Sequence, residues 1–407
     1  MSGGEMQSRR LADALDDYLL AKSKAGQSGN YRRNAERVLE EWIDWLASEQ
    51  STYTFGGVTV DDCEQYALHL RERLADPDDP LSKASSAAKY YDYVSAYLGW
   101  AVERQYLGAN PARHDRAREA LPDTAERETH TQQWWTPDQR QAIVEHVTGR
   151  AREAVDERGL EATTELRDRA LIVAIAYSGA RGGELVADPH DDRRDGLRWG
   201  DVDLDNGTMV VLGKGSQQYV DASLPPQAVT ALDRYRQAVA PPADEWPVFP
   251  TEHRPTLART AREALREATD LDDDGIDGRL DETSATAVLR DLEHPPPALT
   301  TDGLRSILMR LSAAADIPDI DTKAGEYLEP HGGRHGAGDT LVREVGWEAA
   351  QDLLRHKSPE TTMDTYAHID ASETAAQAGR AFARTDGTAT GNPEDGTDPG
   401  DTDANDE

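Results

Sequence analysis

The spacing of apolar residues divides the N-terminal quarter of the chain into helices. Apolar positions recur every three to four residues and alternate with charged ones, and Val38, Trp42 and Leu46 belong to one such stripe. The GANPA sequence at 108–112 then ends the pattern. Two helices are expected within 8–49, a third over 60–74 and a fourth over about 82–105. The pattern predicts a compact, all-helical domain over residues 8–112.

A second region with regular patterning begins at Trp134, after a polar and unpatterned segment at 113–133 that is predicted to be a linker. Its strongest segment, RDRALIVAIAYSGARGGEL, reads as a nearly continuous apolar helix that is interrupted at Ser178-Gly179. Two β-type runs follow at 195–204 and 207–225, and a Gly-Lys-Gly-Ser turn lies in the second of them. This region therefore predicts an α+β domain over 134–384.

Two acidic segments fall outside this pattern. Residues 253–297 are of low pattern and are predicted to be an acidic surface insertion. The tail at 385–407 is rich in Gly, Asp, Thr and Pro, and is predicted to be disordered. The expected fold is thus mainly α with a small antiparallel β-sheet.

Length and composition limit the classes of protein to which the chain can belong. A length of 407 residues suggests two domains. The single cysteine excludes a disulfide framework within the chain. No apolar run reaches the roughly 20 residues that a membrane helix needs, and no apolar run follows the N-terminus, so a soluble, cytoplasmic protein without a membrane partner is expected.

The formal net charge of −33 argues at first against a nucleic-acid partner. The acidic residues are spread along the chain, however, and arginine largely replaces lysine. This composition is expected of a protein from a salt-adapted microbe, because multimolar salt screens repulsion within about 3 Å. On that interpretation the net charge reflects the salt concentration in which the protein works, and only local clusters of charged residues indicate what it binds.

Four short polar motifs carry the candidate catalytic residues. They are Arg181 in GARGGEL, Lys214 in GKGS, His331 and Arg334 in HGGRH, and His356 and Tyr366 in LLRHKSPETTMDTYAH.

These residue types suit the transfer of a phosphodiester without a metal. Attack by a hydroxyl adds negative charge to the nonbridging oxygens, and two fixed guanidinium groups such as Arg181 and Arg334 can stabilise it. A lysine on a tight hairpin, Lys214, can give the leaving oxygen a proton. His331 and His356 can accept a proton or hold the phosphate.

The nucleophile would be the phenol of Tyr366. Ser358 can cap a short helix, Pro359 fits its first position, and Tyr366 then falls two turns further on. A phenol with a pKa near 10 is a poor nucleophile by itself, so its position is informative only together with the cations.

The order Arg, Lys, His-x-x-Arg, His, Tyr behind a helical domain resembles the tyrosine recombinase family, also called the phage integrase family. The resemblance covers residues 8–384. WAVERQYLGANPA is similar to the last helix of that family's core-binding domain, and LRH followed by TYAH is similar to its nucleophile motif. Resemblance implies a helical, SAM-like core-binding domain and an α+β catalytic domain, which together form a C-shaped clamp on double-stranded DNA.

The resemblance also implies the roles of the site residues. Arg181 and Arg334 would clamp the scissile phosphate, and Lys214 would be the general acid. His331 would assist proton transfer, His356 would hydrogen-bond the phosphate, and Tyr366 would form a 3′-phosphotyrosyl intermediate. Because that ester retains the energy of the broken bond, no cofactor is expected. Four copies would assemble around two duplexes from protein that is monomeric when free.

Two features depart from the family pattern. Gly332-Gly333 stands where the family usually has an apolar residue before the second arginine, and this predicts a loosened helix start. The acidic insertion at 253–297 is not part of the common pattern.

Simpler interpretations compete at each position. Arg181 could form a structural ion pair, Lys214 could be an ordinary turn residue, and Tyr366 could be a buried aromatic. His331 and His335 are spaced as zinc ligands could be, but no acidic residue lies between them and no metal is predicted.

Six polar residues of the first domain could contact the DNA backbone, or could simply line solvated helix faces. They are Arg32, Arg33 and Arg37 on one helix and Lys83, Ser86 and Lys89 on another.

Four functions are considered, and the intact set of six residues speaks against the last of them. An integrase that inserts or excises a mobile element is the first. The alternatives are a Xer-type resolvase of chromosomes or plasmids, an enzyme resembling type IB topoisomerases, and a DNA-binding regulator that has lost catalysis.

Overall fold

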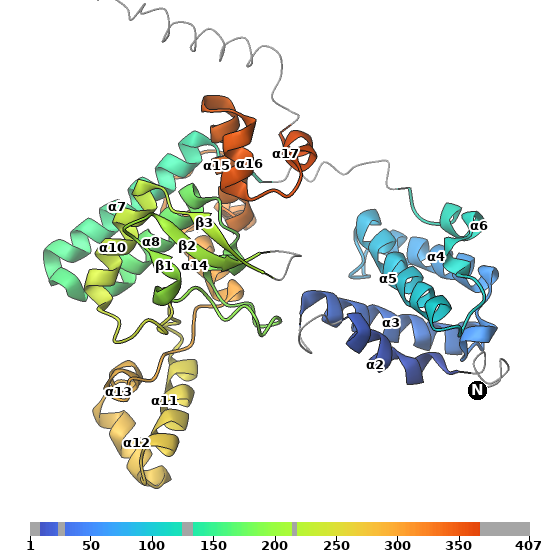
Figure 1. The fold of residues 1–407 in the computed structure, drawn as a ribbon, viewed down its shortest axis with the longest axis horizontal. Coiled ribbons are helices and arrows are strands. Elements are labelled where there is room, and N and C mark those ends of the chain that lie inside the picture. Colours follow the sequence, from blue (N-terminus) through green and yellow to red (C-terminus); the bar gives the residue numbers. More distant parts are fainter. Residues whose placement is uncertain (1–8, 23–28, 124–132, 214–217, 367–407) are drawn as a thin grey trace, which may run out of the picture.

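The computed structural model describes residues 9–22, 29–123, 133–213 and 218–366. Its helices fall into two groups, each with its own hydrophobic core. One group runs from α2 to α6 and the other begins at α7 (Figure 1). The structure is mainly α-helical with one small sheet, which confirms the predicted fold class.

The first group forms around large aromatic side chains. Tyr18, Trp42 and Tyr97 are fully buried, and the Tyr97 hydroxyl donates to the Leu11 carbonyl at 2.6 Å. Thr59 caps one helix through a reciprocal pair of hydrogen bonds with Asp62. The helices are α2 (Leu11–Lys22), α3 (Asn30–Glu49), α4 (Val60–Ala75), α5 (Ala84–Glu103) and α6 (Asp115–Glu119).

The short helix α6 lies within the segment predicted to be a linker. Its Ala117 is fully buried in the first core, and Arg116 forms ion pairs with Asp61 and Glu64 of α4. At the other end of that segment, Gln133 donates to the Tyr327 carbonyl at 2.8 Å. Residues 113–123 therefore extend the first group of helices, and the unpatterned segment is shorter than the sequence suggested.

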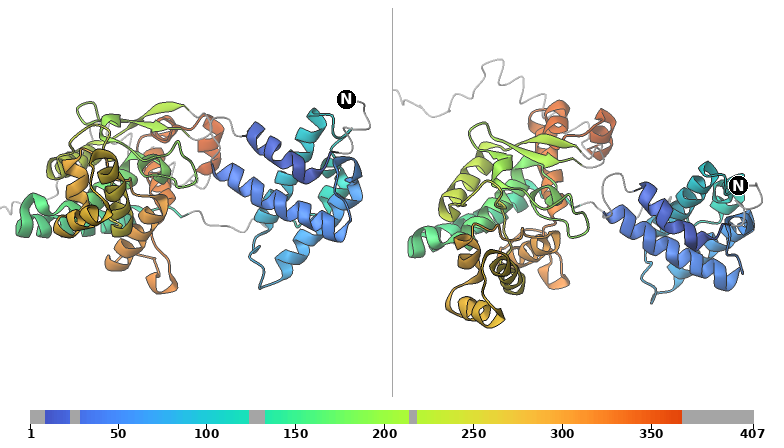
Figure 2. Two further views of the ribbon diagram at one scale, coloured as in Figure 1. Left: turned by 90° about the horizontal axis from the view of Figure 1, so that it is seen from below. Right: turned by 60° about the horizontal axis from the view of Figure 1, so that its bottom comes forward.

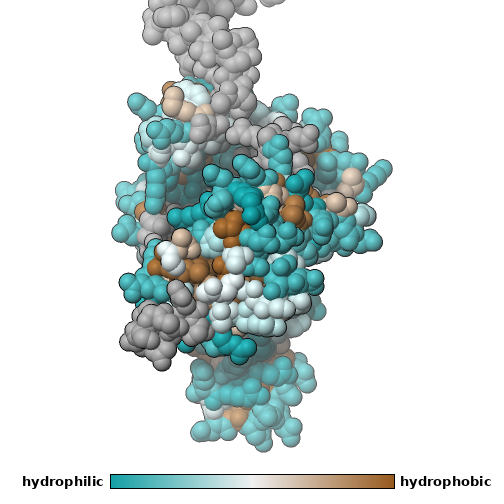
Figure 3. Space-filling model, turned by 90° about the vertical axis from the view of Figure 1, so that its right-hand side faces the viewer, coloured by the Kyte–Doolittle hydropathy of each residue, from teal (hydrophilic) through white to brown (hydrophobic). Residues whose placement is uncertain are grey.

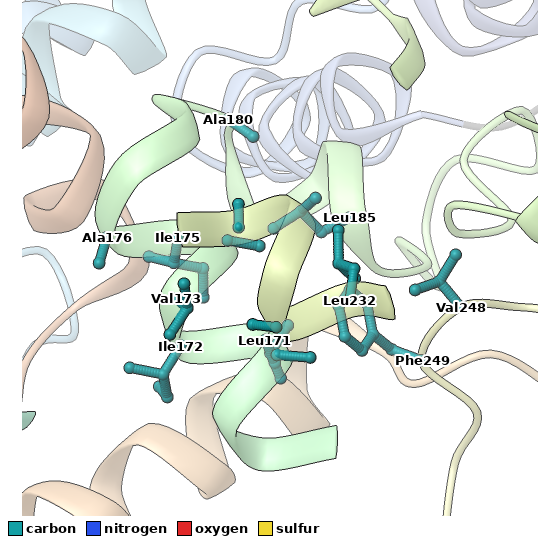
Figure 4. Packing of buried hydrophobic residues seen from close by; sticks show 14 of the residues in the cluster. Leu171, Ile172, Val173, Ile175, Ala176, Ala180, Leu185, Leu232, Val248 and Phe249 are labelled. Atoms are coloured by element: carbon teal, nitrogen blue, oxygen red, sulfur yellow. The ribbon is translucent and has the colours of Figure 1, made fainter. Parts of the chain in front are cut away.

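The second group is organised around α8, which is apolar on almost every side. Helices α7, α10 and α15 pack on it, and Figure 4 shows its Leu171 and Ile175 gathered with Leu232 and Phe249. Burial on all sides explains why the helix reads as a continuous apolar run. The helices here are α7 (Pro137–Arg158), α8 (Thr163–Ser178), α9 (Gly182–Leu185), α10 (Pro226–Val239), α14 (Thr301–Ala314), α15 (Pro330–Glu344), α16 (Trp347–Leu354) and α17 (Pro359–Thr365).

A three-stranded antiparallel sheet covers one side of this core. The strands β1 (Val202–Asp203), β2 (Thr208–Leu212) and β3 (Tyr219–Ser223) lie in that order. Met209 pairs with Ala222, and both are buried. The second predicted β run therefore contains both β2 and β3, which pair with each other, and the first contributes β1; residues 214–217 lie outside the described residues.

The predicted acidic insertion is folded into three helices. They are α11 (Arg254–Ala268), α12 (Asp273–Glu282) and α13 (Ala285–Asp291). Leu257, Leu265, Ile276 and Leu289 form a small core of their own. The helices project from the rest of the second group (Figures 1 and 2), and the lobe at the bottom of Figure 3, where they lie, is mostly hydrophilic.

The weak hydrophobic pattern of this segment did not indicate helices, because charged residues that form ion pairs on the exposed faces make up much of its sequence. Arg262 pairs with Asp277, and Arg266 pairs with Asp273. Each such exposed pair contributes at most about 1 kcal/mol. The few apolar residues, spaced three to four apart, therefore carry the folding of this segment.

The ends of the three-helix segment lie side by side. The Thr251 amide donates to the Pro297 carbonyl at 2.9 Å, and the Leu299 amide donates to the Phe249 carbonyl at 2.7 Å. The chain thus leaves the second group and returns to it at one place.

None of the helices described by the structure has the length and apolar character required to cross a membrane.

Candidate active site

Arg181 stands at the break between α8 and α9. Gly179 ends α8 in the left-handed conformation with φ of 63°, which glycine adopts without strain. Arg181 then precedes α9, and its side chain is 25% exposed. The short helix places this guanidinium at the surface of the second core.

Glu184 holds Arg181 in place. Its side chain is fully buried, Oε1 lies 2.8 Å from Arg181 Nη1, and Oε2 accepts from the Arg181 amide at 2.9 Å. Oε2 also lies 2.5 Å from Nη2 of Arg355. The sequence analysis did not select either of these residues; the three-residue spacing of Arg181 and Glu184 was the available signal.

Arg334 lies on α15 and is only 2% exposed. Its two terminal nitrogens donate to the carbonyls of Gly179 and Leu354, and so join the ends of α8 and α16. Burial and the neighbouring Arg181 lower the pKa of Arg334 to about 9, although Glu184 opposes the shift. The guanidinium is still charged at pH 7, next to Arg181.

Helix α15 runs without interruption from Pro330 through Gly332-Gly333, so the predicted loosening of its start was wrong. A Cβ on Gly333 would lie 2.6 Å from Ile175 Cγ2 and 3.1 Å from the Ile175 carbonyl oxygen. The glycine therefore lets α15 approach the buried helix α8 closely, which positions Arg334.

Two histidines of α15 lie ring against ring. His331 is exposed and His335 is buried, and their rings are 4.4 Å apart and perpendicular. Burial and the nearby His331 lower the pKa of His335 to about 3. His335 is therefore neutral at pH 7.

His356 faces the two arginines from the loop after α16. Its Nδ1 lies 2.8 Å from Thr362 Oγ1, which fixes the ring. Burial, followed by Arg334 and Arg181, lowers the pKa of His356 to about 4. It is a neutral imidazole at pH 7, suited to donating one hydrogen bond.

Tyr366 closes α17, whose first residues follow the expected start signal. The Ser358 hydroxyl accepts from the Glu360 amide, and Pro359 is the first helical residue. The Tyr366 side chain is fully buried, its hydroxyl donates to the His335 carbonyl at 3.5 Å, and its ring lies 5.2 Å from that of Trp134. Burial raises the pKa of Tyr366, although Arg334 opposes the shift.

The phenol fits its pocket because of Gly338. A Cβ at that position would lie 1.8 Å from the Tyr366 hydroxyl oxygen. Tyr366 is thus held as a neutral phenol in contact with the helix that carries Arg334.

The structure brings five of the six predicted catalytic residues to one region. Electrostatic interactions link Arg334 to Arg181 and to Tyr366, and link His356 to both arginines. His331 is joined to them through the ring of His335. Lys214 lies outside the described residues.

Arg194 ties the hairpin to the helix of the first arginine. Its Nη1 donates to the Gly183 carbonyl and to the Leu212 carbonyl, at 3.1 Å in each case. Leu212 ends β2, two residues before Lys214. The sequence analysis missed this residue, because a charged loop residue has no periodic signal.

The six polar residues predicted to contact DNA lie on α3 and around the start of α5. Arg37 donates to the Tyr90 hydroxyl at 2.8 Å and pairs with Glu41, so α3 is joined to α5 beside Lys89. Arg33 lies against His190 of the second group. Arg33, Arg37 and Lys89 are exposed, whereas Arg32, Lys83 and Ser86 are half-buried.

Comparison with known proteins identifies the family of the chain. The profile of the phage integrase family matches residues 134–373, more than half of the chain. The chain therefore belongs to the phage integrase family and is a tyrosine recombinase.

Curated relatives carry the name tyrosine recombinase XerC. The protein of that name from Xanthomonas axonopodis pv. citri (strain 306) is 30% identical over 244 residues, which is 58% of this chain and 69% of the relative. The one from Bifidobacterium longum (strain DJO10A) is 30% identical over 232 residues, covering 54% of this chain and 49% of the relative.

Solved structures share the fold. The integrase of transposon Tn1549, solved with circular intermediate DNA, superimposes with a TM-score of 0.54 and 14% identity, over 91% of this chain and 99% of that chain. XerH recombinase on its difH substrate gives a TM-score of 0.51 and 13% identity, over 90% and 84%. At these identities the likeness concerns the fold alone.

Proposed function

We propose that the protein cleaves and rejoins DNA strands at specific sites through a covalent 3′-phosphotyrosyl intermediate. The observation that carries this proposal is the electrostatic interaction of Arg334 with Arg181, His356 and Tyr366, which brings both guanidinium groups, an imidazole and the phenol into one region. Double-stranded DNA is the substrate, and the cytoplasm is the place of action. Four copies, monomeric when free, assemble at synapsis.

The proposed reaction uses each group for one task. Arg181 and Arg334 bind the nonbridging oxygens of the phosphate, where they offset the charge of the transition state. His356 donates a hydrogen bond to the same phosphate. The neutral imidazole has one N–H, and its Nε2 can donate to a phosphate oxygen while Nδ1 accepts from Thr362.

The bond changes then follow. The Tyr366 oxygen bonds to phosphorus and its proton passes toward His331, while the bond from phosphorus to the 5′ oxygen breaks and Lys214 protonates that oxygen. In the described state the phenol points to the His335 carbonyl, so it turns toward the phosphate before attack. Attack of a 5′ hydroxyl on the tyrosyl ester reverses these steps and joins a strand.

The experiment uses DNA of random sequence, because the target site is not known. The full chain is incubated with a pool of random duplexes, the reaction is stopped with detergent, and DNA attached to protein is recovered and sequenced. A covalent adduct enriched for one motif supports the proposal. Absence of any adduct, or adducts without a common motif, contradicts site-specific recombination, and the second outcome favours relaxation of a topoisomerase kind.

We also propose that the helices α2–α6 form a DNA-binding domain, with the catalytic domain beginning at about residue 133. Arg33, Arg37 and Lys89 are the exposed cations among the six residues expected to contact DNA. The biological role favoured here is insertion or excision of a mobile element. Comparing the recovered motif with the sequence around the gene tests this: a motif at the borders of a mobile element supports it, and one at the terminus of the chromosome supports a resolvase.

The proposed role of Lys214 as general acid can be tested by changing the leaving group of the substrate. Replacing Lys214 with Ala is expected to lower the rate of adduct formation by roughly a hundredfold or more, because the 5′ oxygen leaves without a proton. A substrate with sulfur at that position should restore the rate, since a thiolate leaves unprotonated. The measurement is the single-turnover rate on both substrates, and failure of the sulfur substrate to relieve the defect would remove Lys214 from this role.

The net charge of −33 supports a further proposal, that the protein works at high salt. Between about 0.2 and 3 M KCl the melting temperature is expected to rise by on the order of 10 °C, as screening reduces repulsion among carboxylates. Potassium chloride is used because sulfate stabilises most proteins by exclusion from their surface. A melting temperature that is constant or falls over this range would argue against salt adaptation.

A further inference from the structure

Arg355 is the residue between α16 and His356, and its backbone is unusual. It ends α16 in the left-handed conformation, with φ of 54° and ψ of 45°. Residues with a Cβ are disfavoured there, and glycine or asparagine is the common solution at the end of a helix. A positive φ also occurs at five other non-glycine residues of the described chain, Glu293 among them, so the contacts of the Arg355 side chain decide whether it has a task.

The side chain is directed into the catalytic region. It is 14% exposed, Nη2 lies 2.5 Å from Oε2 of Glu184, and Nη1 donates to the Leu353 carbonyl at 3.3 Å. Burial lowers the pKa of Arg355, and Glu184 opposes that shift. A third guanidinium thus lies beside Arg181 and Arg334, with Glu184 between two of them.

The two oxygens of Glu184 have different partners. Oε1 contacts the Arg181 side chain, whereas Oε2 is held by Arg355 and by the Arg181 amide. Because Oε2 is occupied, the carboxylate cannot form a two-pronged pair with the Arg181 guanidinium, which is the strongest arrangement of these groups. Arg181 therefore keeps donors for another anion.

We propose that Arg355 is a positioning residue for the phosphate clamp: it holds Glu184 so that this carboxylate orients Arg181 without capturing it. The inference rests on the proposed function. Arg355 would act on the rate of strand cleavage more than on the affinity for DNA.

The first test compares three variants. Arg355→Gly removes the side chain and suits the left-handed backbone, so it is expected to fold. It should lower the single-turnover rate of adduct formation by roughly tenfold to a hundredfold at saturating DNA, with Kd changed less than about threefold. Arg355→Lys keeps the charge without the fork and should recover only part of the rate.

Glu293→Gly is the matched control. Glu293 also has a left-handed backbone after a helix, with φ of 52°, and it lies at the end of the three-helix segment. This variant should react as the unmodified protein does. A normal rate in Arg355→Gly, or a loss confined to Kd, would overturn the positioning role.

A second test asks whether Arg355 acts through Glu184. In a double-mutant cycle with Glu184→Gln, the double variant should be no more than about threefold slower than the slower single variant. Rate losses that multiply would show that the two residues act independently, and the inference would fail.

A third measurement does not require DNA cleavage, and so separates this inference from the proposed function. Sulfate in the millimolar range at constant ionic strength, below the concentrations at which its exclusion from the surface stabilises proteins, is the probe of the cationic pocket, and it should raise the melting temperature of the unmodified protein and of Glu293→Gly. In Arg355→Gly, the sulfate concentration that gives half of the maximal rise in melting temperature should be at least about fivefold higher. An unchanged sulfate response would contradict the inference even if the protein forms adducts, whereas absence of adducts with the unmodified protein would count against the function alone.

Discussion

Tyr366→Phe is expected to abolish the covalent adduct with DNA entirely while leaving the affinity for DNA within about threefold of its original value. The change removes the hydroxyl that is proposed to attack phosphorus but keeps the ring that packs against Trp134. The hydroxyl donates to the His335 carbonyl at 3.5 Å, a long and therefore weak hydrogen bond whose loss should change the melting temperature little. Denaturing gel electrophoresis with labelled DNA measures the adduct.

The control is Tyr53→Phe, which removes the same atom from a half-exposed tyrosine of the first group of helices. It should form adducts at the ordinary rate. Adduct in Tyr366→Phe would show that another nucleophile is used.

Arg334→Lys is expected to affect both activity and stability. The guanidinium donates to two buried carbonyls, those of Gly179 and Leu354, and one ammonium cannot replace both donors. Each carbonyl left without a partner costs about 1–3 kcal/mol. The rate of adduct formation should fall by about a hundredfold to a thousandfold, because one donor to the transition state is lost.

Arg343→Lys on the same helix is the matched control, since Arg343 forms a partly exposed pair with Asp339. Chemical denaturation and single-turnover cleavage, measured for both variants, distinguish the two positions. Equal stability of Arg334→Lys and Arg343→Lys would contradict the linking role of Arg334.

The sequence predicted the helices that bury one face, because apolar residues then recur every three to four positions. Helix α4 begins at Val60, as predicted, behind a Thr59 cap. Helix α8 was recognised by its apolar run. Helices α6 and α11–α13 were missed, because few apolar residues such as Ala117 and Leu265 hold them and charged pairs dominate their faces.

The catalytic motifs were visible in the sequence as residue types in a fixed order, but their supports were not. Glu184 and Arg355 lie far apart in the chain and meet only through the packing of α16 against α15 and of α15 against α8. Nor does any pattern encode the direction of the Tyr366 phenol, which depends on the space left by Gly338. Contacts of this kind depend on tertiary structure.

The adjacency of the two ends of the three-helix segment affects how this segment can be gained or lost in evolution. Hydrogen bonds between Thr251 and Pro297, and between Phe249 and Leu299, already close the chain below α11–α13. Because the segment also buries its own apolar residues, a gene could acquire, exchange or discard this stretch in one event while the remaining enzyme kept its architecture. Such a junction allows a strand-transfer enzyme to diversify its periphery without disturbing its chemistry.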